Sequence, residues 1–265
     1  MAVLFSTAWA DAPPPPQALL DDGYRQMYNL DFAHAHTTFI EYERTHPQDP
    51  LGHVSNAAAF LFGEFDRLRV LEFDLFTADS RFESRPKIDP DPVIKNAFEL
   101  ELAAGDRVAQ AQLQRSPNDA NAIFALILAN GLRGDYASLI EKRNLAGLSY
   151  IKSSRGLAER LLILDPNCYD AYLAVGVENY LLSLNAAPIR WFLRLGGAQT
   201  DKQQGLEKLR LTAQKGHYLA PFARLLLAVA AMRDKDSNTA RTLLQGLAVE
   251  FPQNQLYRKE LARIP

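Results

Sequence analysis

Histidine is the residue type here that most directly suggests metal chemistry, because imidazole is a common ligand of Zn²⁺. Four of the five histidines lie between His34 and His53. His34 and His36 are two residues apart, so on a helix they point to nearly opposite sides. His46 and His53 flank a turn that contains proline, and no H-E-x-x-H or C-x-x-C spacing is present. This spacing predicts surface or helix-end histidines, with no metal site and no cofactor.

Nucleophiles and paired acids are also present without the context that catalysis needs. The only cysteine, Cys168, has no histidine near it in the sequence, and the G-x-S-x-G pattern of serine hydrolases is absent. Glu64, Asp66 and Glu178 are of the type that a hydrolase uses as acid and base. Exposed helix faces account for them as well, so we predict no catalytic residue and keep a hydrolase as the alternative.

Bulk properties exclude two classes of protein. The 265 residues carry 29 basic and 31 acidic side chains, a net charge of -2, and no basic run that would serve a nucleic-acid binder. No uninterrupted apolar stretch is long enough to cross a bilayer. A soluble protein-binding or ligand-binding domain fits this composition.

Helical periodicity continues from Gln17 onward, without the alternation of polar and apolar residues that marks strands. The helices are interrupted by similar short motifs, which is the mark of a repeat protein. These motifs are His46-Pro47-Gln48-Asp49, Ser116-Pro117-Asn118-Asp119, Asp165-Pro166-Asn167 and Phe251-Pro252-Gln253-Asn254.

With Pro47 as a closing residue, the first unit resembles a tetratricopeptide repeat, a pair of antiparallel helices of about 34 residues. The matching positions are the small residues Gly23 and Ala35, the turn Asp31-Phe32 and the large Phe39. A last unit matches at Leu227-Ala228, Asp236, Ala240, Leu244 and Pro252-x-Asn254. Another helix shares the register through Tyr172 and Gly176, and the turn signature recurs at Gly134-Asp135-Tyr136.

The stretch from Gly176 to Leu206, within VGVENYLLSLNAAPIRWFLRLGGAQTDKQQGLEKL, carries a narrower resemblance. It is similar to a tetratricopeptide family shared by exported bacterial proteins and by eukaryotic proteins implicated in clearing inclusion bodies near lipid droplets. The resemblance covers about thirty residues and implies no catalytic motif.

These resemblances predict an all-α fold over residues 17–265: an α-solenoid, wound as a right-handed superhelix of antiparallel helix pairs, with insertions. One insertion runs from Asp66 to Pro92, with a helix over Asp66 to Ala78 followed by a loop. The stretch from Tyr136 to Leu164 is expected to be one overlong helix or a pair kinked near Gly147. Residues 185–200 form the third interruption.

Residues 1–16 are expected to lie outside this domain. A short apolar run ending in Ala8-x-Ala10 resembles the end of a secretory signal peptide, and prolines follow from Pro13 to Pro16. This pattern favours an exported protein, periplasmic or associated with the cell envelope. A disordered N-terminus of a cytoplasmic protein is the alternative.

In tetratricopeptide arrays the first helix of each unit lines a concave binding surface, so the resemblance also predicts a groove. Its candidate partner-binding residues are Leu20, Tyr24, Met27, Leu173, Val177, Tyr180, Phe222, Leu225, Val229 and Met232. They are apolar or aromatic, and they offer no charged clamp for a carboxylate. In the alternative, the insertions fill the groove and these residues are core.

A second candidate surface is a possible membrane contact at Arg190, Trp191, Phe192 and Arg194, since two arginines beside aromatic residues suit a membrane interface. A packing segment between repeats explains them as well. The prediction for function is a non-catalytic scaffold that binds a protein or peptide through an apolar concave surface. The alternative is a hydrolase-type enzyme, or a protein that binds a small ligand or lipid in the concave pocket.

Overall fold

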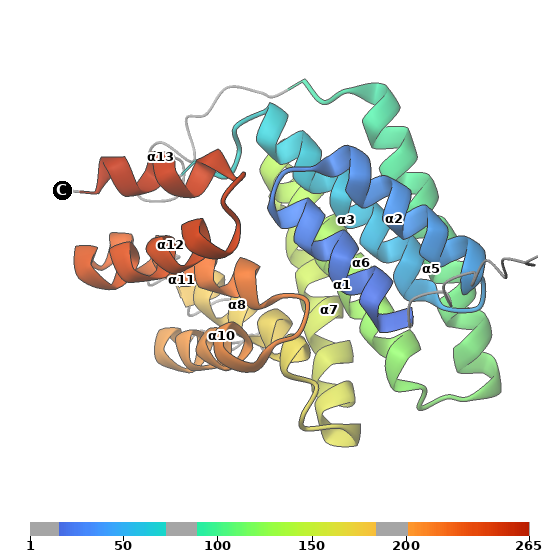
Figure 1. Cartoon of the computed structure of the whole chain (residues 1–265). Coiled ribbons are helices and arrows are strands. Elements are labelled where there is room, and N and C mark those ends of the chain that lie inside the picture. The colour runs from blue at the N-terminus through green and yellow to red at the C-terminus, as the bar shows by residue number, and fades with distance from the viewer. Residues whose placement is uncertain (1–15, 73–88, 184–200, 265) are drawn as a thin grey trace, which may run out of the picture.

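The computed structural model describes residues 16–72, 89–183 and 201–264, and across these ranges it contains eleven α-helices and no β-strand. The all-α prediction is therefore confirmed (Figure 1). The helices are α1 (Pro16–Tyr28), α2 (Phe32–Thr45), α3 (Pro50–Arg67), α5 (Pro92–Arg115), α6 (Ala120–Asp135), α7 (Asn144–Leu164), α8 (Tyr172–Ser183), α10 (Lys202–Lys215), α11 (Ala220–Arg233), α12 (Ser237–Glu250) and α13 (Gln255–Arg263). A π-helical turn at Tyr136–Ile140 and a 3₁₀ turn at Tyr169–Ala171 complete the set.

Each helix packs mainly on the next one along the chain, which is the arrangement of a solenoid. Figure 1 shows α1, α2, α3, α5, α6 and α7 grouped on one side and α8 to α13 on the other. Helix α3 departs from this order, because it also packs against α1 and α6. The solenoid-like fold class is confirmed.

Short polar residues set the helix starts. The residue before a helix accepts a hydrogen bond from one of the first free backbone N–H groups, which otherwise lack a partner. Asp31, Asp49, Asp91, Asp119, Asp201, Asp236 and Asn254 cap helices in this way. The predicted breaks at Pro47, Pro117, Pro166 and Pro252 all fall between helices.

Glycines allow close approaches within two of the helix pairs. A Cβ at Gly23 of α1 would lie 2.3 Å from the Phe39 ring of α2. A Cβ at Gly176 of α8 would lie 3.0 Å from the carbonyl oxygen of Gly205 and from the backbone nitrogen of Leu209 in α10. Only a residue without a side chain fits these contacts unchanged.

The break near residue 140 is not where the repeat pattern predicts it. Gly134 and Asp135 are still helical, and the turn follows at residues 141–143, where Lys142 has a φ of 57°. Gly147 lies inside α7 rather than at a kink, and a Cβ there would meet the Ser138 hydroxyl. The glycine therefore serves helix packing, and the backbone turns several residues earlier.

The predicted helix from Asp66 to Ala78 is wrong where it is described, because α3 begins at Pro50 and ends at Arg67. Arg69 follows with a φ of 54°, a left-handed conformation that stops the helix. The rest of that predicted helix lies outside the described residues, as do residues 1–15 and the whole interruption at 185–200.

Candidate functional site

The ten predicted groove residues lie within the protein rather than along an open surface. Five are buried: Leu20, Tyr24, Met27, Tyr180 and Leu225. The other five are partly buried and pack against the core: Leu173, Val177, Phe222, Val229 and Met232. At these positions the structure agrees with the alternative that the residues are core, and their contact with a partner stays a prediction.

Aromatic contacts between the two ends of the chain explain the burial of Tyr24 and Phe222. The Tyr24 ring of α1 stacks on Tyr218, just before α11, with 4.7 Å between ring centroids. The Phe62 ring of α3 meets Phe222 of α11 edge-on, with 5.5 Å between centroids. We call this region, formed by α1 and α3 on one side and residues 217–263 on the other, the joint.

Hydrogen bonds fix the joint in addition to the rings. Tyr28 Oη donates to the carbonyl oxygen of Tyr218 at 3.0 Å, and Asn254 Nδ2 donates to the carbonyl oxygen of Tyr28 at 2.8 Å. The backbone N–H of Gln253 donates to Asn29 Oδ1 at 3.2 Å. The end of α1 therefore contacts the turn that precedes α13, the last helix.

The loop that carries Tyr218 is held by a buried carboxylate. Asp170, before α8, accepts hydrogen bonds from the backbone N–H groups of His217, Tyr218 and Leu219 at 3.0, 3.0 and 3.1 Å. Three satisfied donors give this loop one conformation, and the Tyr218 ring is thereby presented to α1.

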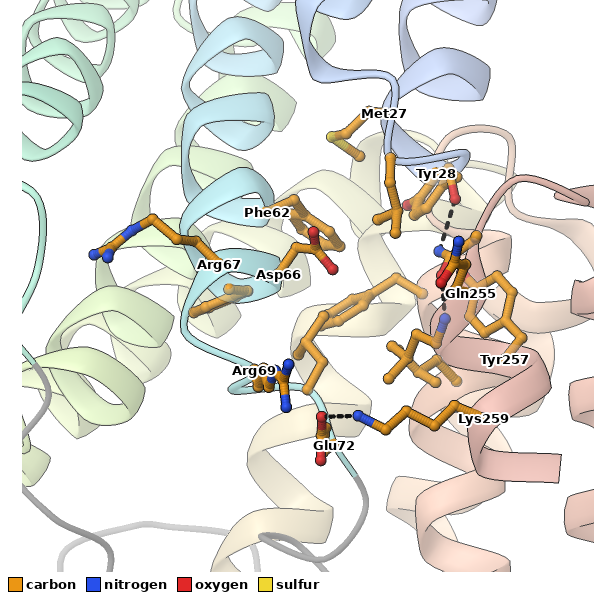
Figure 2. Close-up of a pocket in the computed structure, with 17 residues that line it drawn as sticks. Met27, Tyr28, Phe62, Asp66, Arg67, Arg69, Glu72, Gln255, Tyr257 and Lys259 are labelled. Atoms are coloured by element: carbon orange, nitrogen blue, oxygen red, sulfur yellow. Dashed lines mark hydrogen bonds and ion pairs between the residues drawn. The ribbon is translucent and has the colours of Figure 1, made fainter. Parts of the chain in front are cut away.

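A cleft of about 380 Å³ opens in the joint, between α1, α3 and α13 (Figure 2). Its lining is partly polar and partly apolar, and the apolar part, which we call the floor, includes three residues that were predicted to line a groove. The floor consists of Met27, Phe62, Phe65, Phe222 and Leu225. The sequence therefore identified part of this site, although not its position between the two chain ends.

Two rim residues have left-handed backbone, Leu30 with a φ of 64° and Arg69 with a φ of 54°. Each follows a helix and reverses the chain. Lys142 and Lys235, which do not line the cleft, share this conformation, so it belongs to the turn type rather than to a function. Its consequence is positional, since it places the two side chains at the mouth of the cleft.

Most charges of the rim are paired. Arg67 bonds Glu64 at 2.6 and 2.7 Å, and Figure 2 shows its side chain pointing away from the cleft. Glu72 pairs with Lys259 of α13 and with Arg263, 3.3 Å away. Burial would raise the pKa of Glu72, but its hydrogen bonds to these two cations lower it.

Asp66 and Arg69 are the exceptions, because neither forms an ion pair within the described ranges. Figure 2 shows the Asp66 side chain directed toward α13, beside Phe62. Burial raises the pKa of the Asp66 carboxyl, and the nearby Arg69 charge partly opposes this effect. The mouth of the cleft thus offers one acceptor and one donor that a bound molecule can use.

The candidate acid and base residues do not come together. Glu64 is buried in its pair with Arg67, and it also accepts from the backbone N–H of Asp91 at 2.8 Å. Glu178 is buried against Arg155, with 2.8 Å between the charged atoms. Only Asp66 faces the cleft, and no serine, threonine, cysteine or histidine is among the described lining residues. Cys168 does not line the cleft. Burial raises the pKa of its thiol to about 11.

The histidines separate into different environments. His34 is exposed and bonds Asp31 at 2.8 Å, and His46 stacks on Tyr42 with 4.6 Å between centroids. His53, in contrast, lies beside two carboxylates, Glu43 and Glu101. Sequence spacing missed this group, because it considered histidines alone and Glu101 is contributed by α5, a separate helix.

The possible membrane contact at residues 190–194 lies outside the described residues. One described segment, Ala120–Ile140, is long and apolar enough to cross a bilayer by length and composition alone. More than half of its most apolar window is buried by neighbouring helices, as in a core helix of a globular domain.

Comparison with known proteins adds no assignment: no protein-family model matches the chain, and no curated protein matches it. The tetratricopeptide resemblance therefore rests on the residues named above.

Proposed function

We propose that this chain is a non-catalytic helical scaffold that binds a short segment of a partner protein in the cleft of the joint. The observation that carries the proposal is the chemistry of the cleft, an apolar floor beneath Asp66 and Arg69, which form no ion pair with any described residue. An apolar side chain of the partner would occupy the floor. Its backbone N–H and C=O groups would bond Asp66, Arg69 and the exposed amide of Gln255.

The cleft supports this reading better than a hydrolase, because its described lining has aromatic and charged groups but no nucleophile with a base. A small ligand is the second candidate. A volume of about 380 Å³ lies at the lower end of the range of about 300–1,000 Å³ for small-molecule sites.

Tetratricopeptide membership and export belong to the same proposal. Membership is supported by the ordered register of small residues and by their close contacts, as at Gly23. Export is supported by the apolar run before Ala10 and by the resemblance of the stretch from Gly176 to Leu206. A protein-binding scaffold at the cell envelope is consistent with both.

The test is selection of peptides from a random display library on the full chain, followed by measured affinities for variants. Phe222→Ala removes part of the floor and is expected to weaken the selected peptides at least about fivefold. Leu226→Ala is the matched control, because Leu226 is also a partly buried residue of α11 but does not line the cleft. It should leave affinity unchanged.

Arg69→Gly tests the rim. It removes a guanidinium while keeping a residue that favours left-handed backbone. Lys235→Gly makes the same backbone change away from the cleft. We expect weaker peptide binding only for Arg69→Gly. The proposal is wrong if the library yields no binder, or if selected peptides bind Phe222→Ala and Arg69→Gly as tightly as the wild type.

A further inference from the structure

A second polar site lies away from the cleft, where α2, α3 and α5 meet. Glu43, His53 and Glu101 each direct one ligand atom to a common point, and the three atoms lie within 4.8 Å of one another. His53 Nδ1 is 2.8 Å from Glu101 Oε2 and 3.4 Å from Glu43 Oε2. It is the only such group of histidine and carboxylate ligands within the described ranges.

A buried amide orients both carboxylates. Asn56, 1% exposed, donates from Nδ2 to Glu43 Oε1 at 3.1 Å and to Glu101 Oε1 at 3.2 Å. Its Oδ1 lies 2.6 Å from His36 Nδ1, so an N–H there sets the direction of the amide. Each carboxylate therefore has one oxygen held by Asn56 and the other free to face His53. Metal ligands are typically held in this way by an outer layer of hydrogen bonds.

Two glycines bring the three helices close enough for this arrangement. A Cβ at Gly52, next to His53, would lie 2.8 Å from Glu43 Cγ. A Cβ at Gly105, one turn after Glu101 on α5, would lie 2.7 Å from Val54 Cγ2. Larger residues at either position would move a carboxylate away from the imidazole.

The local charge favours a cation. Two carboxylates, Glu43 and Glu101, share a partly buried space beside the imidazole of His53. The three side chains keep between 14% and 24% of their surface exposed, so solvent reaches the common point from one side.

We propose that Glu43, His53 and Glu101 bind one divalent transition-metal ion, with Zn²⁺ the ion that their donor atoms fit best. Tetrahedral Zn²⁺ with bonds of about 2.0–2.1 Å separates its ligand atoms by about 3.3 Å. The observed 2.8 and 3.4 Å from the imidazole nitrogen bracket that value. The ligands are His53 Nδ1, Glu43 Oε2 and Glu101 Oε2, and water takes the fourth position. Any proton on Nδ1 is released to solvent when the ion binds.

This site is independent of the cleft. His53 and Asp66 lie near opposite ends of α3, about 20 Å apart at about 1.5 Å of rise per residue. Loss of metal binding and loss of peptide binding therefore report on different proposals.

The experiment is calorimetric titration of the full chain, first stripped with a chelator, with ZnCl₂. We expect one ion per chain. His53→Gln and Glu101→Gln should each weaken binding at least about tenfold, and Asn56→Ala about tenfold through the loss of orientation. His34→Gln is the matched control, because His34 also bonds a carboxylate, Asp31, but has no third ligand. It should leave affinity and stoichiometry unchanged.

A second measurement does not depend on any variant folding. Co²⁺ added to the stripped wild type should give the intense visible absorption of a four-coordinate ion, and Zn²⁺ should displace it. The proposal is overturned if the wild type binds no Zn²⁺ or if His53→Gln and Glu101→Gln, folded by circular dichroism, bind it unchanged. It is also overturned if Co²⁺ shows only the weak absorption of a six-coordinate aqueous ion. In each of these cases the group is an ion pair between His53 and the carboxylates.

Discussion

The α8–α10 pair and the joint are both closely packed, but through different kinds of contact. In the pair, backbone lies almost on backbone, because Gly176 and Gly205 face each other across the two helices. In the joint, aromatic rings and single hydrogen bonds connect residues from opposite ends of the chain, such as Tyr24 and Tyr218. A contact between backbones tolerates almost no added volume, whereas a contact through side chains leaves space, and here that space is the cleft.

The largest expected effect is in the pair. Tyr180→Ala removes a ring that is 6% exposed in the small core between α8, α10 and α11. It should lower the free energy of unfolding by about 3–5 kcal/mol, because a cavity remains where the ring was. Urea unfolding measures this. Leu145→Ala, at a residue 87% exposed, is the control and should change stability by less than about 0.5 kcal/mol.

Gly176→Leu should have the second largest effect and lower the free energy of unfolding by about 1–3 kcal/mol. Its side chain would push against backbone atoms of Gly205 and Leu209. Gly156→Ala provides the contrast. A Cβ at Gly156 meets nothing within 4 Å, so alanine there should stabilise α7 by up to about 1 kcal/mol. Thermal melts of both variants test the register, and a Gly176→Leu protein as stable as the wild type would show that the pair is not closely packed.

Phe222→Ala should have a smaller effect on stability, about 1 kcal/mol, because the ring is only partly buried at the cleft. A loss as large as that of Tyr180→Ala would mean that Phe222 acts mainly through its packing in the joint and not as a binding surface. The unfolding midpoint, measured beside the peptide affinity, separates these two roles.

The smallest effect concerns the ion pairs across the joint. Glu72→Gln removes the pairing with Lys259 and Arg263, and it should cost less than about 1 kcal/mol at neutral pH. The folded-state pKa of Glu72 is lowered, so its contribution is present above the ordinary pKa of glutamate and disappears as the pH falls through the lowered value. Wild type and Glu72→Gln should therefore converge in stability in acid, and a difference that persists there would rule out this charge pairing as the cause.

Contacts between consecutive helices were the most predictable part of the molecule. Gly23, Ala35 and Phe39 stand at the spacing expected for one helix pair, and the structure places Gly23 against the Phe39 ring. The turn predicted at Gly134 was wrong, because the sequence does not distinguish a glycine that permits close helix packing from a glycine in a turn. Here the helix continued, and Lys142 made the turn.

Local chemistry in this sequence determined the helices, their caps and their order, because a helix depends on residues three and four positions apart and a cap on its immediate neighbours. The cleft and the histidine–carboxylate group depend on residues far apart in the chain, such as Glu72 with Lys259 and His53 with Glu101. Glu72 and Lys259 meet only because small angles between successive helices add up along the array, and no local pattern encodes that sum. His53 and Glu101 meet because α3 packs against α5 across an intervening stretch of chain, and no local pattern sets that register. The tertiary structure alone therefore decided that the predicted groove residues are buried and that the two ends of the chain meet around a cleft.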